Sequence, residues 1–292
     1  MSSNINQSTT INKIEKISRN IFTIFFKEES YFKLKNKVKL FLIKKNTPIK
    51  DLKIFLKTLH PYKTNIELIR IGDKNKDGGY LVPNDLRNIE AIFSPGVSTN
   101  WSFEEECIKK GIKKAYLADG SVNPKIKNEN IHFIKKFIGS KKSSDFITLE
   151  NWIKTSKIKE NSDLMLQMDI EGWEYDVIKS TSSETLNKFR IILVEFHNFE
   201  FLLNKEFFLK VKKVFEKLLQ THYIVHIHPN NVGYPINYKE ITINPLLEFT
   251  FLRKDRVTFK EYQTTFPHPL DIKNMKDRKD VRLSKDFYYS NK

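Results

Sequence analysis

The stretch Leu164-Met-Leu-Gln-Met-Asp-Ile-Glu-Gly-Trp-Glu174 runs from an almost wholly apolar segment directly into an acidic turn. Residues 164–168 predict a strand that is buried on both faces, as is typical of parallel sheets. Glu171 and Glu174 stand near the start of a predicted helix, where the backbone dipole stabilises negative charge. That dipole explains Glu174 well and Asp169 poorly, because Asp169 stands at the end of the strand. Asp169 is therefore a candidate for a functional role.

The same succession of strand, turn and helix recurs on both sides of this stretch. The other predicted strands are residues 91–94, 115–118, 131–134, 191–194, 223–226 and 247–251. Helical stretches are expected near residues 102–111, 148–156, 173–187 and 205–220. Strands that alternate with helices imply right-handed crossovers and a mostly parallel sheet. No long helix separates the last two strands, so we expect an antiparallel pair at one edge of a seven-stranded, Rossmann-like α/β sheet.

The composition excludes several classes of protein. The 292 residues include one cysteine, Cys107, which excludes a disulfide framework and a thiolate metal cluster. No apolar run approaches the ~20 residues of a membrane span, and the polar N-terminus does not resemble a secretory signal, so we expect a cytoplasmic protein. The formal charge of +16 concentrates in the first part of the chain. It suits an anionic glycan, a sugar nucleotide or a membrane surface as well as a nucleic acid, which is not the expected substrate.

The sequence predicts three segments. Residues 1–60 form a basic helical N-terminal extension, residues 61–272 a Rossmann-like domain and residues 273–292 a polar C-terminal tail. Further helices are expected within the extension at 31–43 and 48–59. Before them, apolar residues recur at steps of three and four, as an amphipathic helix requires, at Ile11, Ile14, Ile17, Ile21, Ile24 and Phe25. This stripe predicts packing against the main domain or a second subunit of a homodimer, with peripheral membrane contact as the alternative.

Small and acidic residues follow the first two predicted strands. In the first turn Gly96 allows backbone amides to approach a cofactor closely. Asp119 ends the second strand about twenty residues later, where an acidic residue accepts hydrogen bonds from ribose hydroxyls. An ordinary turn and an Asp that caps its own turn remain the alternatives. The predicted cofactor-binding residues here are Ser94, Gly96, Ser98, Asp119, Gly120 and Ser121.

Ionisable groups also stand at the ends of the later strands. Glu195 and His197 are two residues apart and are expected on one side of their strand. Of His226 and His228, we expect only one to face the site. Asn230 and Asn231 follow and are candidates for binding acceptor hydroxyls, although an Asn pair after a proline is also ordinary turn chemistry. Three strand ends with ionisable groups predict a catalytic site, because active sites gather such groups.

Together these residues resemble the FkbM-type family of S-adenosylmethionine-dependent methyltransferases. The resemblance covers roughly residues 68–271, and the Asp169-Ile-Glu-Gly172 motif is its most specific part. The glycine loop is degenerate, since it holds one glycine. The remaining motifs are Arg70-Ile-Gly72 with Asp77-Gly-Gly-Tyr80, Ser94-Pro-Gly96, Ser102-Phe-Glu104, Asp119, Val194-Glu-Phe-His197, His226-Ile-His-Pro-Asn-Asn231, Leu247-Glu-Phe-Thr-Phe251 and Pro267-His-Pro-Leu-Asp271.

The family resemblance implies a methyltransferase version of the sheet and transfer of a methyl group from S-adenosyl-L-methionine to oxygen. The acceptor would be a hydroxyl of a sugar, a glycan precursor or another small metabolite, including carbohydrates of surface polysaccharides. Asp119 and Asp169 would contact the cofactor, with Asp145 and Phe146 near its adenine. The predicted substrate-binding residues are Tyr80, Glu171, Asn230 and Asn231.

The reaction requires a group that removes the hydroxyl proton. We rank His197 first, then Asp169 and His228, because a neutral imidazole suits this role near neutral pH. A divalent-metal site for Mg or Mn is the rival role, since oxygen and imidazole ligands would suit it. Its candidate ligands are Asp169, Glu195, His197 and His228.

Three other functions compete with this interpretation. A nucleic-acid methyltransferase is favoured by charge alone, and no nucleic-acid-binding module is recognisable. A non-catalytic binding or scaffold protein of the same fold would have no need of polar strand ends. A sugar-nucleotide oxidoreductase would require a fuller glycine-rich loop.

Overall fold

The computed structural model describes residues 34, 37–74 and 77–289. The chain divides into two compact units, residues 1–44 and 45–292. The apolar stripe predicted between residues 11 and 25 lies outside the described residues, and of the helix expected at 31–43, residues 37–42 are helical. The helix α3 (Ile49–Thr58), which the sequence assigned to the extension, packs within the second unit instead. The Phe55 ring meets the rings of Phe208 and Phe215 edge-on, at 5.6 and 5.8 Å between centroids.

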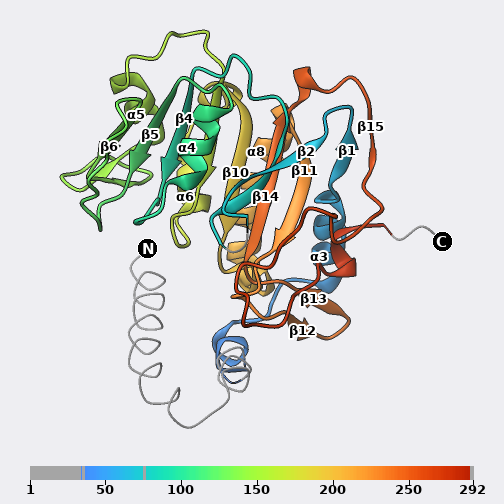
Figure 1. The fold of residues 1–292 in the computed structure, drawn as a ribbon. Coiled ribbons are helices and arrows are strands. Elements are labelled where there is room, and N and C mark those ends of the chain that lie inside the picture. The colour runs from blue at the N-terminus through green and yellow to red at the C-terminus, as the bar shows by residue number, and fades with distance from the viewer. Residues whose placement is uncertain (1–33, 35–36, 75–76, 290–292) are drawn as a thin grey trace. The chain divides into compact units, whose positions relative to one another are not determined.

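The second unit is built on a seven-stranded sheet with the order β11-β14-β10-β9-β4-β5-β6 (Figure 1). Its strands are β4 (Ala91–Pro95), β5 (Lys114–Ala118), β6 (Ile131–Ile134), β9 (Leu164–Met168), β10 (Phe189–Phe196), β11 (His222–Pro229) and β14 (Leu247–Arg253). All seven were predicted. Only β14 runs antiparallel to its neighbours, β10 and β11. The expected antiparallel pair is therefore present, with β11 at the edge and β14 inserted between β11 and β10.

The strand order reverses between β4 and β9, which lie side by side in parallel. From β4 the chain moves outward through β5 to β6, and it then crosses back to β9 and continues to β10. In open α/β sheets, ligands bind beyond the carboxyl ends of the strands at such a switch point. The turns after β4 and β9 therefore mark the place of a binding site.

Helices and a hairpin cover the two faces of this sheet. The hairpin β2 (Leu68–Gly72) and β3 (Gly79–Pro83) lies with α4 (Ser102–Lys109) over one face, where Ile71, Val82 and Phe103 share one apolar cluster with Ile92 and Met165. The opposite face packs against α5 (Leu149–Thr155), α6 (Glu174–Ser180), α7 (Ser183–Asn187) and α8 (Lys205–Thr221). The helix predicted at 173–187 is thus two helices. The side chain of Ser182 caps the second by accepting from the Thr185 amide.

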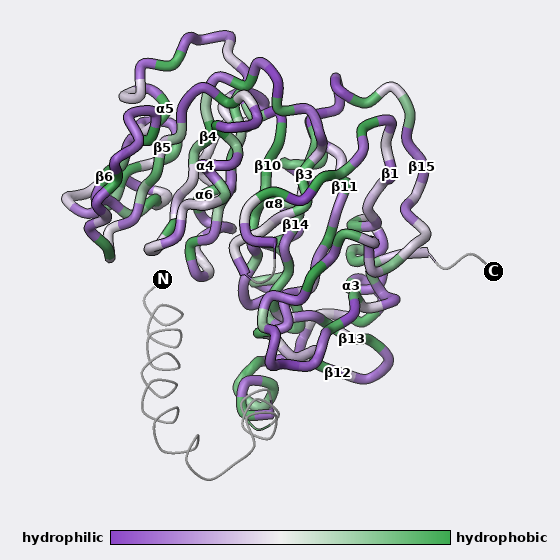
Figure 2. Tube along the Cα trace, viewed as in Figure 1, coloured by the Kyte–Doolittle hydropathy of each residue, from purple (hydrophilic) through white to green (hydrophobic). Residues whose placement is uncertain are grey.

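The face under the hairpin changes from apolar to polar along the strands. On β10, Ile191 and Leu193 point to this face, and the same alternation brings Glu195 to it at the carboxyl end. Neighbouring strands place Gln167, Glu248 and further polar groups beside Glu195. Figure 2 shows the complementary pattern at a coarser scale, with hydrophobic stretches in strands such as β10 and hydrophilic ones in the connecting loops. Polar groups therefore collect at one end of an otherwise apolar layer.

Several short elements were not predicted. They include the pairs β1 (Tyr62–Thr64) with β15 (Lys260–Tyr262), β7 (Phe137–Ile138) with β8 (Phe146–Ile147), and β12 (Ile236–Tyr238) with β13 (Ile241–Ile243). The 3₁₀ turns are η1 (Phe199–Leu203), η2 (Lys254–Arg256) and η3 (Lys285–Phe287). The described part of the predicted tail is packed rather than loose, since Asn274, Ser284 and Phe287 are buried. Within the described ranges, no helix has the length and apolar character needed to cross a bilayer.

A buried guanidinium ties the amino ends of the parallel strands together. Arg190, 4% exposed, lies at the start of β10. It donates to Asp163, before β9, at 2.5 and 3.0 Å, and to Asp85, beyond β3, at 3.3 Å. It also donates to two main-chain carbonyls, those of Asp85 and Arg87. Removing the guanidinium would leave two carboxylates without their shared partner.

We expect Arg190→Ala to lower the free energy of unfolding by about 2 kcal/mol, because it removes charged hydrogen bonds to Asp163 and Asp85, which keep only Arg253 and Arg256 as partners. Urea denaturation measures this change. The matched control is Lys212→Ala, which removes an exposed i,i+4 pair with Glu216 and should cost less than about 0.5 kcal/mol. Equal losses in the two variants would contradict a structural role for Arg190.

Candidate active site

The floor of the site is a close contact between the turns that follow β4 and β9. Gly96 has φ +87°, and a Cβ atom added there would lie 1.6 Å from the carbonyl oxygen of Asp169. The Gly96 amide donates to the Ala118 carbonyl at 2.9 Å, and the Asp169 amide donates to the Pro95 carbonyl at 3.2 Å. Glycine is required here both for its backbone conformation and for the lack of a side chain. The approach of this backbone to a cofactor, which the sequence predicted for Gly96, stays a prediction.

Asp119 joins the turns after β4 and β5. One carboxylate oxygen accepts from the Ser98 amide at 2.9 Å, and the other accepts from the amide and hydroxyl of Ser121 at 2.8 and 2.6 Å. The contacts with Ser121 are those of an Asp that caps its own turn, which was the alternative interpretation. The contact with the Ser98 amide positions the glycine turn. Ribose hydroxyls would have to use the remaining lone pairs of this carboxylate.

Three aromatic rings lie in a row next to these turns. The Phe146 centroid is 5.5 Å from that of Phe137 and 6.0 Å from that of Trp173. Phe137 and Trp173 are 42% and 48% exposed. A Cβ added at Gly120 would lie 2.4 Å from the Phe137 ring, so this glycine allows the ring to pack on the backbone. Asp145 is exposed, and its carbonyl accepts from the Phe137 amide at 2.9 Å. Three mutually tilted aromatic rings, two of them half-exposed, thus lie beside Asp145 and include Phe146, and binding of an adenine there stays a prediction.

Ser94 does not face these rings. It is completely buried. Its hydroxyl lies beside the carboxyl of Glu104 on α4, where burial raises the pKa of Glu104 to about 7 although Ser94 lowers it. The prediction of Ser94 as a cofactor contact is therefore corrected, since its side chain points into the layer between the sheet and α4. The backbone around Gly96 remains available.

The acidic turn after β9 is organised around Glu174. The Glu174 side chain is fully buried, and one of its oxygens accepts from the amides of Ile170 and Gly172 at 3.1 and 3.0 Å. Glu171 and Gly172 both have positive φ, at 56° and 102°. The backbone therefore curls around a carboxylate, and this curl directs Asp169 and Glu171 outward. The Glu171 side chain is 87% exposed.

His197 lies directly in front of this turn. Its Nδ1 is 3.1 Å from both the Glu174 carboxylate and the Glu195 carbonyl. Both partners are acceptors, so Nδ1 carries a proton and donates. Its Nε2 then points toward Asp169 and Glu171, at 3.8 and 3.5 Å. Hydrogen bonds thus fix the imidazole through Nδ1, and Nε2 faces the carboxylates of Asp169 and Glu171.

The charges of this group shift two pKa values. Burial alone would lower the pKa of His197, but its hydrogen bond to Glu174 and the nearby carboxylates raise it to about 9. Burial raises the pKa of Asp169 to about 7, which His197 opposes and Glu171 and Glu174 reinforce. Near neutral pH the imidazole is therefore mostly protonated, whereas Asp169 is present in both forms. The raised pKa of His197 therefore disfavours it as the proton acceptor, the role for which the sequence ranked it first.

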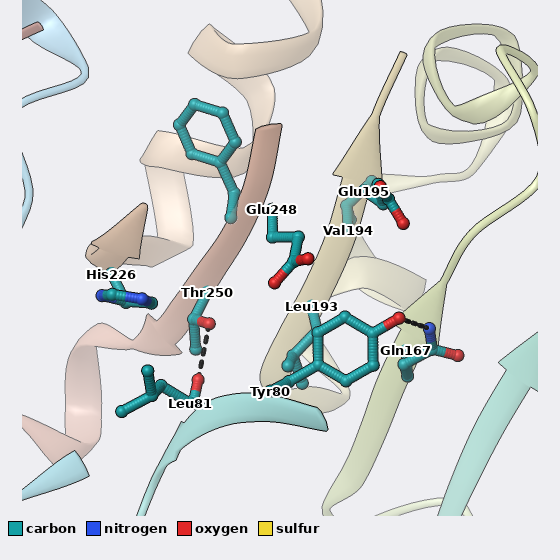
Figure 3. Close-up of a pocket in the computed structure, with 10 residues that line it drawn as sticks. Tyr80, Leu81, Gln167, Leu193, Val194, Glu195, His226, Glu248 and Thr250 are labelled. Carbon is teal, nitrogen blue, oxygen red and sulfur yellow. Dashed lines mark hydrogen bonds between the residues drawn. The ribbon is translucent and has the colours of Figure 1, made fainter. Parts of the chain in front are cut away.

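A second polar group lies on the face under the hairpin, where Tyr80, Gln167, Glu195 and Glu248 come together (Figure 3). Asn230 donates to Glu195 at 2.8 Å, and Gln167 donates to the Tyr80 hydroxyl at 3.3 Å. Burial, together with the charges of Asp169 and Glu248, raises the pKa of Glu195 well above its usual range. A small cavity of about 10 Å³, room for about one water molecule, lies among these residues. Tyr80 and Asn230, two of the predicted substrate-binding residues, thus both lie near Glu195.

Two expectations about the edge strands are corrected. His226 and His228 face the same side, because residues two apart in a strand point the same way. Their rings are nearly parallel, with centroids 6.4 Å apart. Asn231 is completely buried, and its amide exchanges hydrogen bonds with the main chain of Met275 at 2.8 and 2.9 Å. Asn231 therefore holds the C-terminal segment in place and is not available to an acceptor.

The four predicted metal ligands do not form one convergent set among the described residues. Asp169 and His197 group with Glu171, whereas His228 groups with His226 and Asp271. Glu195 is hydrogen-bonded to Asn230 between them. Oxygen and imidazole ligands for a cation are therefore present in two places rather than one.

One protein family matches the part of the chain that carries the switch point. Residues 87–223 match the family described as the methyltransferase FkbM domain. This match covers a little under half of the chain. The matched range includes β4, β5, β9 and β10 with the turns that carry Gly96, Asp119, Asp169 and His197. The family resemblance drawn from the sequence is thus confirmed. No curated protein matches the chain.

Three solved structures illustrate the structural neighbours. A protein of Streptococcus thermophilus described as a hemolysin shares 9% identity at a TM-score of 0.36, covering 58% of this chain. A protein of Streptococcus mutans described as a methyltransferase, in complex with SAH, shares 10% at a TM-score of 0.30, covering 71% of this chain and 98% of that one. The precorrin-6y C5,15-methyltransferase of Geobacter metallireducens shares 10% identity at a TM-score of 0.31, and the match covers 72% of this chain and 92% of that one. The chain spans 61% of the length of the first. TM-scores this low assign no function to the chain.

Several residues that shape the site were not predicted from the sequence. Glu174 was assigned to helix stabilisation, yet it positions both the acidic turn and His197. Glu248, Asp271 and Asn274 come from segments far along the chain and received no role. The motif segments that contain Glu248 and Asp271 were noted in the family resemblance, so a signal existed for these two. Asn274 lay in the predicted C-terminal tail, where no motif had been noted.

We expect Gly96→Ala to reduce affinity for S-adenosylhomocysteine by at least about tenfold, equivalent to about 1.4 kcal/mol, because the new Cβ must push the Asp169 turn away. The matched control is Gly111→Ala, at φ +108° with nothing within 4 Å of the added Cβ. It carries similar backbone strain, about 1–2 kcal/mol, without the clash. Isothermal titration and thermal melting of both variants give the comparison. Unchanged affinity in folded Gly96→Ala would refute the close-approach role.

The pKa of His197, raised from 6.5 to about 9, predicts a pH-dependent contribution to stability. This contribution is fully present below pH 6.5 and is lost as the pH rises through about 9. We expect the difference in unfolding free energy between wild type and His197→Gln to shrink by about 3 kcal/mol over that interval. Urea denaturation across this range measures it.

NMR titration of the histidine rings supplies an internal control. Burial lowers the pKa of His222 to about 4, with its Nε2 held by the Phe189 carbonyl at 2.7 Å. The two rings should therefore titrate on opposite sides of the usual histidine range. A His197 midpoint at or below 6.5 would show that the carboxylates do not hold its proton.

Proposed function

We propose that the protein is an S-adenosylmethionine-dependent O-methyltransferase whose acceptor is a hydroxyl of a sugar, a glycan precursor or another small metabolite, including precursors of surface polysaccharides. The observation that carries the proposal is the switch-point site of an FkbM domain, in which Gly96 and Asp169 meet beside an imidazole and several carboxylates. When bound, S-adenosylmethionine supplies an activated methyl group. The protein must align a hydroxyl, exclude water and take up the proton.

The residues present suit the cofactor. The backbone from Gly96 to Ser98 forms a tight turn at the carboxyl end of β4, next to Asp119, which is where ligands bind in open α/β sheets. We assign the ribose to Asp119 and the adenine to the Phe146 surface, flanked by the half-exposed Trp173. An aromatic face that is neither fully buried nor isolated supports stacking of a base.

We assign uptake of the acceptor proton to Asp169 rather than to His197. A general base must be unprotonated in the resting enzyme, and its pKa serves best near the working pH. The pKa of Asp169, about 7, meets this condition, whereas that of His197, about 9, does not. The imidazolium of His197, held by Glu174, is then a positioning group whose charge favours the ionised form of Asp169. His228 is excluded on the same ground, since Asp271 and Glu248 overcome its burial and raise its pKa to about 9.

The polar face beside Asp169 supports a hydroxylated acceptor. Tyr80, Gln167 and Asn230 offer donors, and Glu195 offers both an acceptor and, when protonated, a donor. A sugar presents hydroxyls that each donate and accept, so a surface of mixed donors and acceptors suits it better than a purely cationic one. Glu171, on the exposed rim, would contact the outer part of the acceptor.

The test combines cofactor binding with an acceptor screen. Isothermal titration should show binding of S-adenosylmethionine and S-adenosylhomocysteine. Incubation with sugars and sugar nucleotides should then yield a product heavier by one methylene group, detected by mass spectrometry. Absence of binding to either ligand would refute the proposal. Methylation of RNA or DNA in place of every sugar would transfer the activity to a nucleic-acid substrate.

We expect Asp169→Asn to lower turnover by at least about 100-fold, the usual contribution of a general base. Thermal stability should be retained or increased, because the substitution removes a partly buried charge. The matched control is Asp176→Asn in α6, an exposed acid paired with Lys210, which should leave turnover unchanged. Full activity in folded Asp169→Asn would contradict the assignment.

A further inference from the structure

Three side chains converge at the edge of the sheet without hydrogen-bonding to one another. His226 Nε2 lies 3.0 Å, and His228 Nδ1 3.4 Å, from the same oxygen of Asp271, Oδ1. The three atoms lie within 4.8 Å of one another. Each is buried and lacks a hydrogen-bond partner. The side chains are 8%, 8% and 6% exposed. Buried polar atoms normally find partners, so this arrangement requires an explanation.

Each of the three is aimed by its local structure. His226 and His228 project from β11 on the same face, opposite Thr250 and Glu248 of β14. Asp271 ends a turn in which its second oxygen, Oδ2, accepts from the His268 amide at 2.8 Å, and its own amide donates to the His268 carbonyl at 2.9 Å. One carboxylate oxygen is therefore fixed by the turn, and the other is left pointing at the two imidazoles.

A second layer of hydrogen bonds determines the tautomer of His228. The Asn274 Nδ2 donates to carboxylates of both Asp77 and Glu248, at 3.0 and 2.6 Å. The Oδ1 of Asn274 must then be the acceptor that faces His228 Nε2 at 3.2 Å. Nε2 carries the proton and donates it, which leaves the lone pair of neutral His228 on Nδ1. An outer amide that orients a histidine in this way is typical of metal-ligating imidazoles.

In neutral His228 the lone pair of Nδ1 faces Asp271 Oδ1 across 3.4 Å. Two such acceptors stay together only with a proton on Nδ1 or with a metal ion between them, and a metal ion would take the place of that proton. Two ligands about 2.0–2.1 Å from a tetrahedral zinc ion stand about 3.3 Å apart, which agrees with the spacing of these atoms. The set of two imidazoles and one carboxylate is also that of catalytic metal sites that keep a position open.

We propose that His226, His228 and Asp271 bind one divalent transition-metal ion, with zinc as the reference ion, and leave at least one coordination position free. The site is distinct from the group of Asp169, Glu171 and His197. His226 also lines the cavity beside Tyr80 and Glu195, so the ion adjoins the polar face (Figure 3). Binding would fasten the segment around Asp271 to β11 and so raise thermal stability.

The metal-free alternative is an ion cluster in which Asp271 is flanked by protonated imidazoles. It accounts for the charges, but it leaves the atoms without the hydrogen bonds that an ion pair of this burial would normally make. The two interpretations differ in a directly measurable way, since only the first predicts stoichiometric binding of a metal ion.

The experiment is isothermal titration of the full chain, stripped with a chelator, with zinc chloride. We expect one ion per chain at neutral pH, weaker binding as the histidines become protonated at lower pH, and a melting temperature that rises with zinc concentration. Cobalt(II) provides a spectroscopic probe, since its visible absorption reports nitrogen and oxygen ligands. His226→Gln and Asp271→Asn should each weaken binding by at least about 100-fold, more than the loss of an outer-layer partner.

Two controls separate this site from other histidines. His197→Gln removes the imidazole of the other convergent group, and His132→Gln removes an exposed one; both variants should bind zinc as the wild type does. Circular dichroism without metal verifies that each variant is folded. If Asp271→Asn does not fold, His226→Gln alone tests the site. Failure of the wild type to bind zinc, or binding that survives both ligand substitutions, would overturn the proposal. Binding of S-adenosylhomocysteine, measured separately, tests the methyltransferase assignment independently.

Discussion

The contact between two backbone turns at the centre of the sheet is the constraint on which the site depends. Gly96 lies so close to the Asp169 carbonyl that no side chain fits between them, and main-chain hydrogen bonds join both turns to the strands beside them. The places of Asp169 and Asp119 are therefore set by the backbone of three adjacent parallel strands. Such a support is stiff, since moving one turn would require moving its neighbours.

Charge compensation is the second constraint on this molecule. Carboxyl groups of Asp169, Glu195 and Glu248 are gathered in a region with little water, and burial raises the pKa of each. The histidines that face them, His197 and His228, have raised pKa values for the reciprocal reason. A cluster of this kind holds protons that are shared between neighbours, and its members titrate together. A change at one residue therefore alters the proton affinity of the others, which suits a reaction that must take up a proton.

Much of the fold was accessible from local pattern. Buried parallel strands such as β9 read as short apolar runs, and long amphipathic helices such as α8 repeat every three to four residues. Elements of two or three residues, such as β7 and β8, were missed because pairing partners rather than composition define them. The same limitation applies to α3, whose amphipathic pattern shows that it packs but not against which unit.

The sequence by itself determined the order of strands and helices, the polar residues that follow each strand, and the family to which residues 87–223 belong. Tertiary structure decided which of those residues meet. Asp169 and His197 come together, Asn231 turns away to hold the C-terminal segment, and Asp271 joins two histidines of an edge strand. It also decided their protonation, because a pKa depends on burial and on neighbours brought from distant parts of the chain. Local pattern records how a segment is buried, whereas chemistry depends on which segments are buried together.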